Sequence, residues 1–137
     1  MSRILIIEDH PDNMELAVFL LNTAGHVVYS ATDAEEGLAL AQKQLPDLIL
    51  MDIQLPGMDG LQATRLLKSG VATAGIPVIA LTALAMMGDE QRIRAAGCDG
   101  YIGKPIGIQT FLDTVSEHLL RRPTPGESAA GAGTSER

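Results

Sequence analysis

The fold of this 137-residue chain is decided by one stretch, Pro46-Asp47-Leu48-Ile49-Leu50-Met51-Asp52-Ile53-Gln54-Leu55-Pro56-Gly57-Met58-Asp59-Gly60. Its apolar segment, Leu48 to Met51, is short and unbroken, which is typical of a strand covered on both faces of a parallel sheet. Asp52 ends this segment, and a loop rich in turn residues follows. Because ligands bind at the carboxyl ends of strands in open parallel sheets, Asp52 is a candidate site residue. The alternative is that Asp52 only caps a turn, and the rest of the chain has to decide between the two.

The composition indicates one soluble domain with an aliphatic core. Apolar residues make up 46% of the chain and charged residues 20%, with two Tyr, two Phe and no Trp. The net charge of −7 disfavours direct binding to nucleic acid or to an anionic membrane. The single cysteine, Cys98, excludes an internal disulfide and fits a small buried residue in a reducing compartment. Without a signal peptide or an apolar run of bilayer length, we expect a cytoplasmic protein.

Strands and helices alternate along the chain. The expected strands are short apolar or β-branched runs, at Arg3–Ile7, His26–Ala31, Leu48–Asp52, Ile76–Leu81 and Gly100–Gly103. The expected helices lie between and after them, at Asp12–Ala24, Asp33–Gln44, Leu61–Ser69, Gly88–Ala96 and Ile108–Leu120. This alternation predicts an α/β fold in which helices cover both faces of a parallel sheet through right-handed crossovers. All five strands then point their carboxyl ends at the same edge.

Local signals refine the helices. The spacing of Asp12 with Glu15, and of Asp33 with Glu36, predicts a capping box at the start of each of the first two helices. In the last helix one apolar stripe is expected to face the sheet; it consists of Ile108, Phe111, Leu112, Val115 and Leu119.

The character of the chain changes after Arg121. The remaining residues are mostly small or polar, include two prolines, and show no apolar periodicity. Such a segment cannot bury enough apolar surface to fold. We therefore expect one domain over residues 1–122 and a disordered C-terminal tail over residues 123–137.

Polar side chains of complementary chemistry follow four of the expected strands. The first strand is followed by Glu8 and Asp9, the third ends at Asp52, and Thr82 and Lys104 follow the fourth and fifth. Carboxylates within about 5 Å of each other repel by roughly 3 kcal/mol per pair at an effective dielectric near 20, so such a cluster favours a bound cation. Oxygen ligands suit Mg²⁺, and we identify no His/Cys set for zinc. Together with an ammonium and a hydroxyl, this arrangement could hold a phosphoryl group on an aspartate.

At this point the sequence resembles the receiver domains of bacterial two-component response regulators. The resemblance covers about residues 3–120 and rests on Glu8-Asp9, Leu50-Met51-Asp52, Leu55-Pro56-Gly57-Met58-Asp59-Gly60, Leu81-Thr82-Ala83 and Lys104-Pro105. It implies a flavodoxin-like (βα)5 fold, a doubly wound five-stranded parallel sheet with strand order 2-1-3-4-5. The segments Asp47–Pro56 and Met86–Arg94 look like those of single-domain regulators of the cell-cycle type.

The resemblance also implies roles for the candidate residues. Asp52 would accept a phosphoryl group from a phosphohistidine on a sensor kinase or a histidine phosphotransfer protein. Asp9 and Asp52 would bind Mg²⁺ directly, together with the backbone carbonyl of Gln54, and Glu8 would bind it directly or through water. Lys104 would contact the phosphoryl oxygens, next to a cis peptide bond to the following proline.

Further residues would transmit the signal. Thr82 would close on the phosphoryl group, and the small Ala83 would leave its backbone amide accessible. Tyr101 matches the family's switch aromatic, although an amphipathic residue at a sheet edge is the alternative. Gln54 and Leu84 would flank the phosphoryl group and tune its hydrolysis. The expected effector surface, which could also support a phosphorylation-dependent homodimer, comprises Gly88–Arg94, Tyr101, Gly103 and Gly107–Gln109.

Three other functions compete with this interpretation. Phosphatases and phosphotransferases of the haloacid-dehalogenase type use Asp-x-Asp, but Gln54 occupies the second position, so the general acid is missing. A nucleotide-binding module would need GxGxxG after the first strand or GxxxxGK[ST], and neither occurs. A receiver-like docking module that is never phosphorylated would not need the acids, Thr82 and Lys104. We therefore predict a self-phosphorylating signalling domain, without separate substrate turnover.

Overall fold

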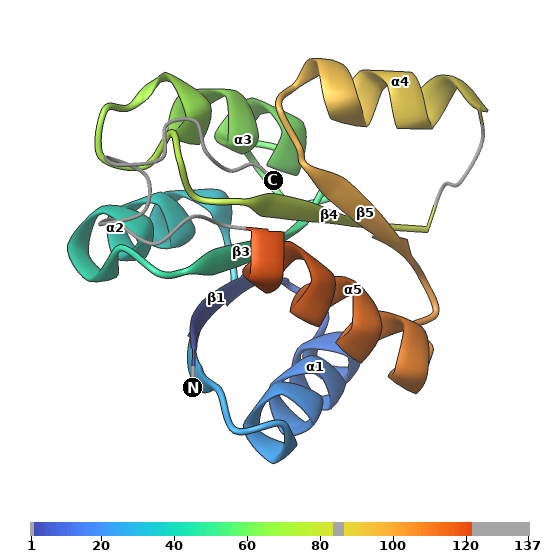
Figure 1. The fold of residues 1–137 in the computed structure, drawn as a ribbon. Helices are drawn as coiled ribbons and strands as arrows, with labels where there is room; N and C mark the ends of the chain where they lie inside the picture. Colours follow the sequence, from blue (N-terminus) through green and yellow to red (C-terminus); the bar gives the residue numbers. More distant parts are fainter. Residues whose placement is uncertain (1, 84–86, 122–137) are drawn as a thin grey trace.

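The computed structural model describes residues 2–83 and 87–121, and in them five parallel strands alternate with five helices (Figure 1). The strands are β1 (Arg3–Ile7), β2 (Val27–Ala31), β3 (Leu48–Asp52), β4 (Val78–Thr82) and β5 (Gly100–Gly103). The helices are α1 (Pro11–Thr23), α2 (Ala34–Gln44), α3 (Gly60–Ser69), α4 (Met87–Ala95) and α5 (Ile108–Arg121). The sheet order is β2-β1-β3-β4-β5, which confirms the expected flavodoxin-like α/β fold.

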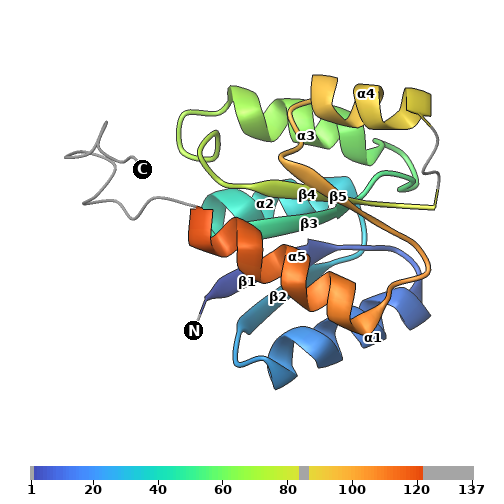
Figure 2. The ribbon, with the colours of Figure 1, turned by 45° about the vertical axis from the view of Figure 1, so that its right-hand side comes forward.

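The sheet separates two hydrophobic cores, because successive strand side chains point to opposite faces. Helices α1 and α5 cover one face, while α2, α3 and α4 cover the other (Figure 2). Towards α1 and α5 the strands bury Ile4, Ile6, Leu48, Leu50, Ile79 and Leu81. Towards the other three helices they bury Leu5, Ile7, Ile49, Met51, Val78 and Ala80. This two-sided burial explains why β1, β3 and β4 are continuous apolar runs in the sequence.

The predicted strand bounds are confirmed for β1, β3 and β5 and shift slightly for the other two. β2 begins at Val27 because the amide of His26 bonds to the Leu21 carbonyl, at the end of α1, rather than to the sheet. β4 begins after Pro77, which has no amide hydrogen for a ladder, and it extends to Thr82, which pairs with Gly103.

The start of the first helix was predicted wrongly. α1 begins at Pro11 with His10 as its N-cap, and no side chain makes a capping bond there. Proline is favoured at the first helical position because its φ is already helical and its missing amide hydrogen has no partner to lose. The capping box of Asp12 and Glu15 therefore does not form. Asp12 instead lies in the first turn, where its negative charge interacts favourably with the positive end of the helix dipole.

Of the two hydrogen bonds in the predicted capping box of Asp33 and Glu36, one forms and the other goes to a neighbouring residue. The side chain of Asp33 accepts a hydrogen bond from the Glu36 amide at 2.8 Å, as predicted. The Glu36 carboxylate accepts from the Thr32 amide at 3.1 Å, one residue before the cap. α3 has a cap that the sequence interpretation missed, because Asp59 accepts from the Gln62 amide at 2.8 Å.

The stripe on α5 is confirmed except at its first residue. Phe111 and Val115 are buried, and Leu112 and Leu119 pack against the same core. Ile108 is 59% exposed, because it opens the helix beyond the edge of the packed face. α4 starts one residue earlier than expected and ends at Ala95.

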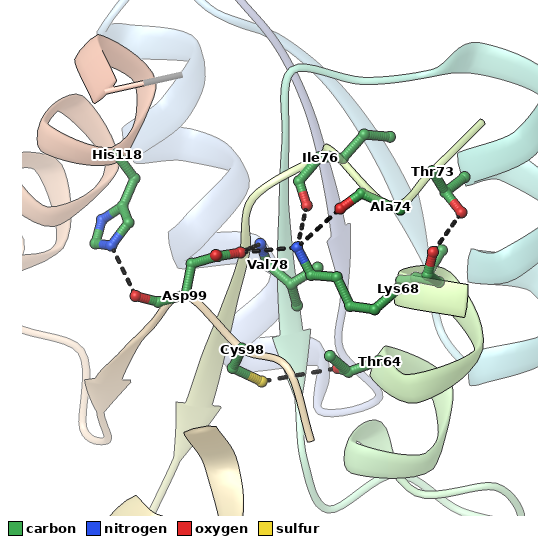
Figure 3. Close-up of polar contacts among 10 residues, drawn as sticks. Thr64, Lys68, Thr73, Ala74, Ile76, Val78, Cys98, Asp99 and His118 are labelled. Atoms are coloured by element: carbon green, nitrogen blue, oxygen red, sulfur yellow. Dashed lines mark hydrogen bonds and ion pairs between the residues drawn. The ribbon is translucent and has the colours of Figure 1, made fainter. Parts of the chain in front are cut away.

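The amino end of the sheet is closed by a network of charged and polar groups (Figure 3). Lys68 of α3 forms an ion pair with Asp99 at 2.9 Å and donates to the Ile76 carbonyl at 2.8 Å. The same Asp99 oxygen accepts from the Val78 amide at 2.8 Å, and His118 Nε2 lies 3.3 Å from the Asp99 backbone oxygen. These contacts tie α3, β4 and α5 to the loop before β5.

The remaining expectations concern the single cysteine, Leu84, the C-terminal segment and the absence of a membrane span. Cys98 is buried, as predicted, and its thiol contacts Thr64 Oγ1 at 3.8 Å. Leu84 and the segment 123–137 lie outside the described residues. Within residues 2–83 and 87–121, none of the helices is both long and apolar enough to cross a bilayer.

Candidate functional site

The candidate residues meet at the carboxyl edge of the sheet. Glu8 follows β1 directly, Asp52 is the last residue of β3 and Thr82 the last of β4. These three residues are at most 1% exposed. Lys104 follows β5, and its amide donates to the Thr82 carbonyl at 2.8 Å, which ties the ends of β4 and β5 together. The predicted convergence is thus present.

Lys104 forms ion pairs with two buried carboxylates, those of Glu8 and Asp52. Its Nζ lies 3.0 Å from Glu8 Oε1 and 3.2 Å from Asp52 Oδ2. The Lys104 side chain is only 12% exposed, so this ammonium interacts with little solvent screening. The peptide bond from Lys104 to Pro105 is cis, as the resemblance implied.

The environment of Asp52 disfavours its charged form. Burial raises the pKa of this carboxyl above its ordinary value, and the nearby Glu8 carboxyl raises it further. The Gln54 amide, which donates to Asp52 Oδ1 at 2.9 Å, and the Lys104 ammonium act in the opposite direction. One cation therefore does not compensate the desolvation and repulsion that Asp52 experiences.

Unsatisfied oxygens in this cluster show where a second cation fits. Among the described residues, Glu8 Oε1, Asp9 Oδ1 and Asp52 Oδ2 are buried atoms that accept no hydrogen bond, although two of them face Lys104 as an ion pair. Buried acceptors without hydrogen bonds are costly unless a cation satisfies them. Ligand atoms from Glu8, Asp9, His10 and Asp52 all lie within 4.8 Å of one another. The donor set and its geometry therefore fit a divalent cation.

His10 is a member of this cluster that the sequence interpretation missed. Its ring Nδ1 lies 3.4 Å from Glu8 Oε2 and 3.4 Å from Asp9 Oδ1, and its amide donates to Glu8 Oε2 at 3.1 Å. The signal was present, since His10 directly follows the two acids. A single imidazole among carboxylates does not resemble the sets of several His or Cys residues that mark zinc sites.

Gly60 makes the close approach of α3 to Asp52 possible. A Cβ at this position would overlap the backbone oxygen of Asp52 and lie 2.7 Å from the Cα of Ile53. The Gly60 amide donates to the Ile53 carbonyl at 3.2 Å. The last residue of the Leu55-to-Gly60 motif is thus required by packing directly behind the candidate phosphoacceptor.

The remaining candidates lie around this edge. Ala83 is exposed and follows Thr82 directly. The side chain of Gln54 is exposed, two residues beyond Asp52. Tyr101 packs partly against the core beneath α2, α3 and α4, and its hydroxyl donates to Glu90 of α4 at 3.4 Å.

Comparison with known proteins identifies the class. The model of the response regulator receiver domain matches residues 4–116. The polar-differentiation response regulators DivK of Brucella anthropi and Brucella ovis are each 46% identical to this chain over 116 residues, which make up 85% of this chain and 94% of the relative.

Solved structures agree with this match. A putative response regulator from Chloroflexus aurantiacus superposes with a TM-score of 0.84 at 30% identity, covering 88% of this chain and 98% of that one. The receiver domain of the sensor histidine kinase PA1611 from Pseudomonas aeruginosa gives 0.81 at 32% identity, covering 86% and 97%. In that crystal structure a magnesium ion is coordinated in the active site cleft.

The chain belongs to the response regulator receiver domain family. It is a signalling domain of the two-component type, similar to DivK regulators and to chemotaxis-type receivers. The haloacid-dehalogenase-type and docking-module alternatives are not favoured by these matches.

Proposed function

We propose that Asp52 accepts a phosphoryl group from a phosphohistidine, and that the protein works as a single-domain regulator in a bacterial phosphorelay. The observation that carries the proposal is the position of the Asp52 carboxylate. It ends the central strand, faces Lys104 Nζ at 3.2 Å and lies within the cluster of carboxylates around Glu8. The phosphoryl donor would be a sensor histidine kinase or a histidine phosphotransfer protein.

Each residue has a distinct part in the transfer. An Asp52 oxygen attacks phosphorus, the bond from phosphorus to the donor's imidazole nitrogen breaks, and an acyl phosphate forms. Lys104 Nζ, which lies 3.2 Å from Asp52 Oδ2, would then bind a phosphoryl oxygen. Thr82, at the end of β4, would donate its hydroxyl to another phosphoryl oxygen, and the exposed Ala83 leaves room for its amide to do the same.

The cation in this proposal is Mg²⁺, held by Glu8, Asp9, Asp52 and the backbone carbonyl of Gln54. When bound, it neutralises charge that develops on the phosphoryl oxygens. The unsatisfied oxygens of Glu8 and Asp9 support this assignment. Magnesium in the cleft of the PA1611 receiver domain supports it independently.

The output would be a changed protein contact. Phosphorylation adds charge and acceptor oxygens at the strand ends, and it shifts the population of conformations there. The Tyr101 hydroxyl bond to Glu90 links β5 to α4, which makes Tyr101 a suitable reporter of that shift. We propose that the surface of α4, β5 and α5 binds a downstream effector, or a second copy of the chain, once Asp52 is phosphorylated. The protein would act in the cytoplasm without turnover of a separate substrate.

A small phosphodonor with Mg²⁺ tests the proposal. We expect the intact mass to rise by one phosphoryl group, and the reaction to stop when a chelator removes the metal. The Asp52→Asn variant should not gain this mass. Labelling of Asp52→Asn to the extent of the wild type would contradict the role of Asp52, and labelling that ignores the chelator would contradict the role of Mg²⁺.

We also propose that residues 1–122 form the whole receiver domain and that residues 123–137 contribute no stable contact. The composition of this tail offers no apolar face that could dock. Deletion of residues 123–137 should therefore change the free energy of unfolding by less than about 0.5 kcal/mol in urea denaturation. A clearly larger loss would show that the tail packs on the domain.

A further inference from the structure

We propose that His10 is a fourth side-chain ligand for the cation and that it raises the affinity of the site for transition metals that bind imidazole, with little effect on the affinity for Mg²⁺. The inference rests on the proposed metal role of Glu8, Asp9 and Asp52 and adds a residue that sets metal selectivity. It concerns binding, and it holds or fails independently of phosphoryl transfer.

The geometry around the His10 ring carries the first step. Nδ1 lies 3.4 Å from both Glu8 Oε2 and Asp9 Oδ1. Ligand atoms bonded at about 2.0–2.1 Å to one metal ion lie about 3.3 Å apart in a tetrahedral arrangement and about 3.0 Å apart in neighbouring octahedral positions. The imidazole nitrogen therefore lies close to the separation of a tetrahedral site and about 0.4 Å beyond that of an octahedral one.

The surrounding carboxylates carry the second step. Glu8 and Asp52 are 0% and 1% exposed. Glu8 Oε1 and Asp52 Oδ2 accept no hydrogen bond from the described residues and face Lys104 Nζ, whereas Glu8 Oε2 faces His10. One ligand atom from each of Glu8, Asp9, His10 and Asp52 lies within 4.8 Å of the ligand atoms of the other three. His10 is the N-cap residue of α1, has extended backbone and makes no side-chain capping bond, so its ring is not engaged by the helix terminus.

Ligand chemistry carries the third step. Mg²⁺ binds oxygen and keeps much of its water, so an imidazole adds little to its affinity. Ni²⁺ and Zn²⁺ bind imidazole well, and their affinity for a mixed nitrogen and oxygen site exceeds that of earlier divalent metals. A single imidazole among three carboxylates should thus raise the affinity for Ni²⁺ and Zn²⁺ more than the affinity for Mg²⁺.

Calorimetric titration of the untagged full-length protein tests the inference. MgCl2 and NiCl2 are titrated separately into the wild type and into His10→Gln. We expect the substitution to weaken Ni²⁺ binding by about tenfold or more, which is a typical effect of disturbing the coordination of a metal. Mg²⁺ affinity should change by less than about twofold. His10 is exposed and makes no side-chain capping bond, so the fold should tolerate the change; His10→Asn, with a better N-cap residue, serves as the second variant.

Matched controls come from the other two histidines. His26 precedes β2 and His118 contacts the Asp99 carbonyl, so both lie at the amino end of the sheet. His26→Gln and His118→Gln should leave Ni²⁺ affinity unchanged. In the wild type, Zn²⁺ should shift the ring nitrogen resonances of His10 and not those of the other two histidines.

The outcomes separate this inference from the proposed function. Unchanged Ni²⁺ affinity in both His10 variants, or an equal loss for Ni²⁺ and Mg²⁺, would overturn the ligand role of His10 and leave the role of Asp52 intact. A His10-dependent Ni²⁺ site in a protein that gains no phosphoryl group with Mg²⁺ would support this inference and contradict the proposed function.

Discussion

The two ends of the sheet differ in how completely their charged groups are paired. At the amino end, Lys68 and Asp99 form an ion pair. Lys68 also donates to the Ile76 carbonyl, and Asp99 accepts from the amide of Val78, the first residue of β4. At the carboxyl end, Glu8 and Asp52 share the single ammonium of Lys104 and keep oxygens without hydrogen bonds. The same fold therefore contains one charged cluster that is satisfied internally and one that requires something from outside.

This difference assigns the two clusters different tasks. A satisfied network fixes the geometry of the elements that it joins, because breaking it leaves buried polar groups without partners. A cluster with unsatisfied carboxylates costs stability in the isolated protein and gains when a cation or a phosphoryl group binds. Removal of a carboxylate charge, at Asp99 or at Asp52, should thus change stability with opposite sign at the two ends.

The largest effect is expected where the carboxyl end is most tightly packed. Gly60→Ala places a Cβ against the backbone of Asp52 and Ile53, which cannot move aside as a flexible side chain could. Overpacking of this kind should lower the free energy of unfolding by about 3 kcal/mol in urea denaturation. Gly75→Ala is the matched control, since a Cβ there meets no atom within 4 Å. Equal stability of the two variants would contradict the close approach of α3.

The amino end should respond next most strongly. Asp99→Ala removes the acceptor of the Val78 amide and the partner of the Lys68 ammonium together. The expected loss is about 1–3 kcal/mol, because charge-assisted bonds of partly buried groups are involved. Asp113→Ala removes an exposed carboxylate that bonds only to Gln109 among the contacts described, and should change stability by less than about 0.5 kcal/mol. A loss at Asp99 no larger than at Asp113 would mean that the network is not structural.

The smallest effect, and the one of opposite sign, is expected at Asp52. Its pKa is raised in the folded protein, so stability falls as pH rises from the unfolded pKa through the folded one. In metal-free buffer at neutral pH, Asp52→Asn removes that penalty and should stabilise the protein by on the order of 1 kcal/mol. The gain should shrink in acid, where wild-type Asp52 is protonated. Destabilisation at neutral pH would indicate that the Lys104 ion pair outweighs the repulsion.

Much of the fold could be predicted because its strands are buried on both faces. β1 and β3 were placed correctly, since apolar runs with short flanking turns leave little choice of register. The short edge strand β5 was placed correctly between its two glycines, Gly100 and Gly103. The start of α1 could not be found from capping patterns, because Pro11 and Asp12 both mark a helix start and only the chain path decides between them. Ile108 fitted the helical stripe, but periodicity does not tell where the packed surface ends.

The sequence predicted which strand-end residues meet at the candidate site, but neither the inclusion of His10 nor the distances. Parallel strands bring Glu8, Asp52 and Lys104 to one edge whatever the details of packing. His10 lies 3.4 Å from two carboxylates because of the conformation of the turn into α1. No sequence pattern predicted that conformation. Burial, which raises the pKa of Asp52, likewise becomes visible only when the helices are in place.

Chemical trapping of the phosphorylated residue tests the central claim most directly. The protein is incubated with Mg²⁺ and a small phosphodonor and then reduced with borohydride, which converts an aspartyl phosphate to homoserine. Peptide mapping should find homoserine at position 52 in the wild type and in His10→Gln, and at no position in Asp52→Asn. Homoserine at Asp9 or Asp59 instead, or none in a wild-type protein that binds Mg²⁺, would contradict the account.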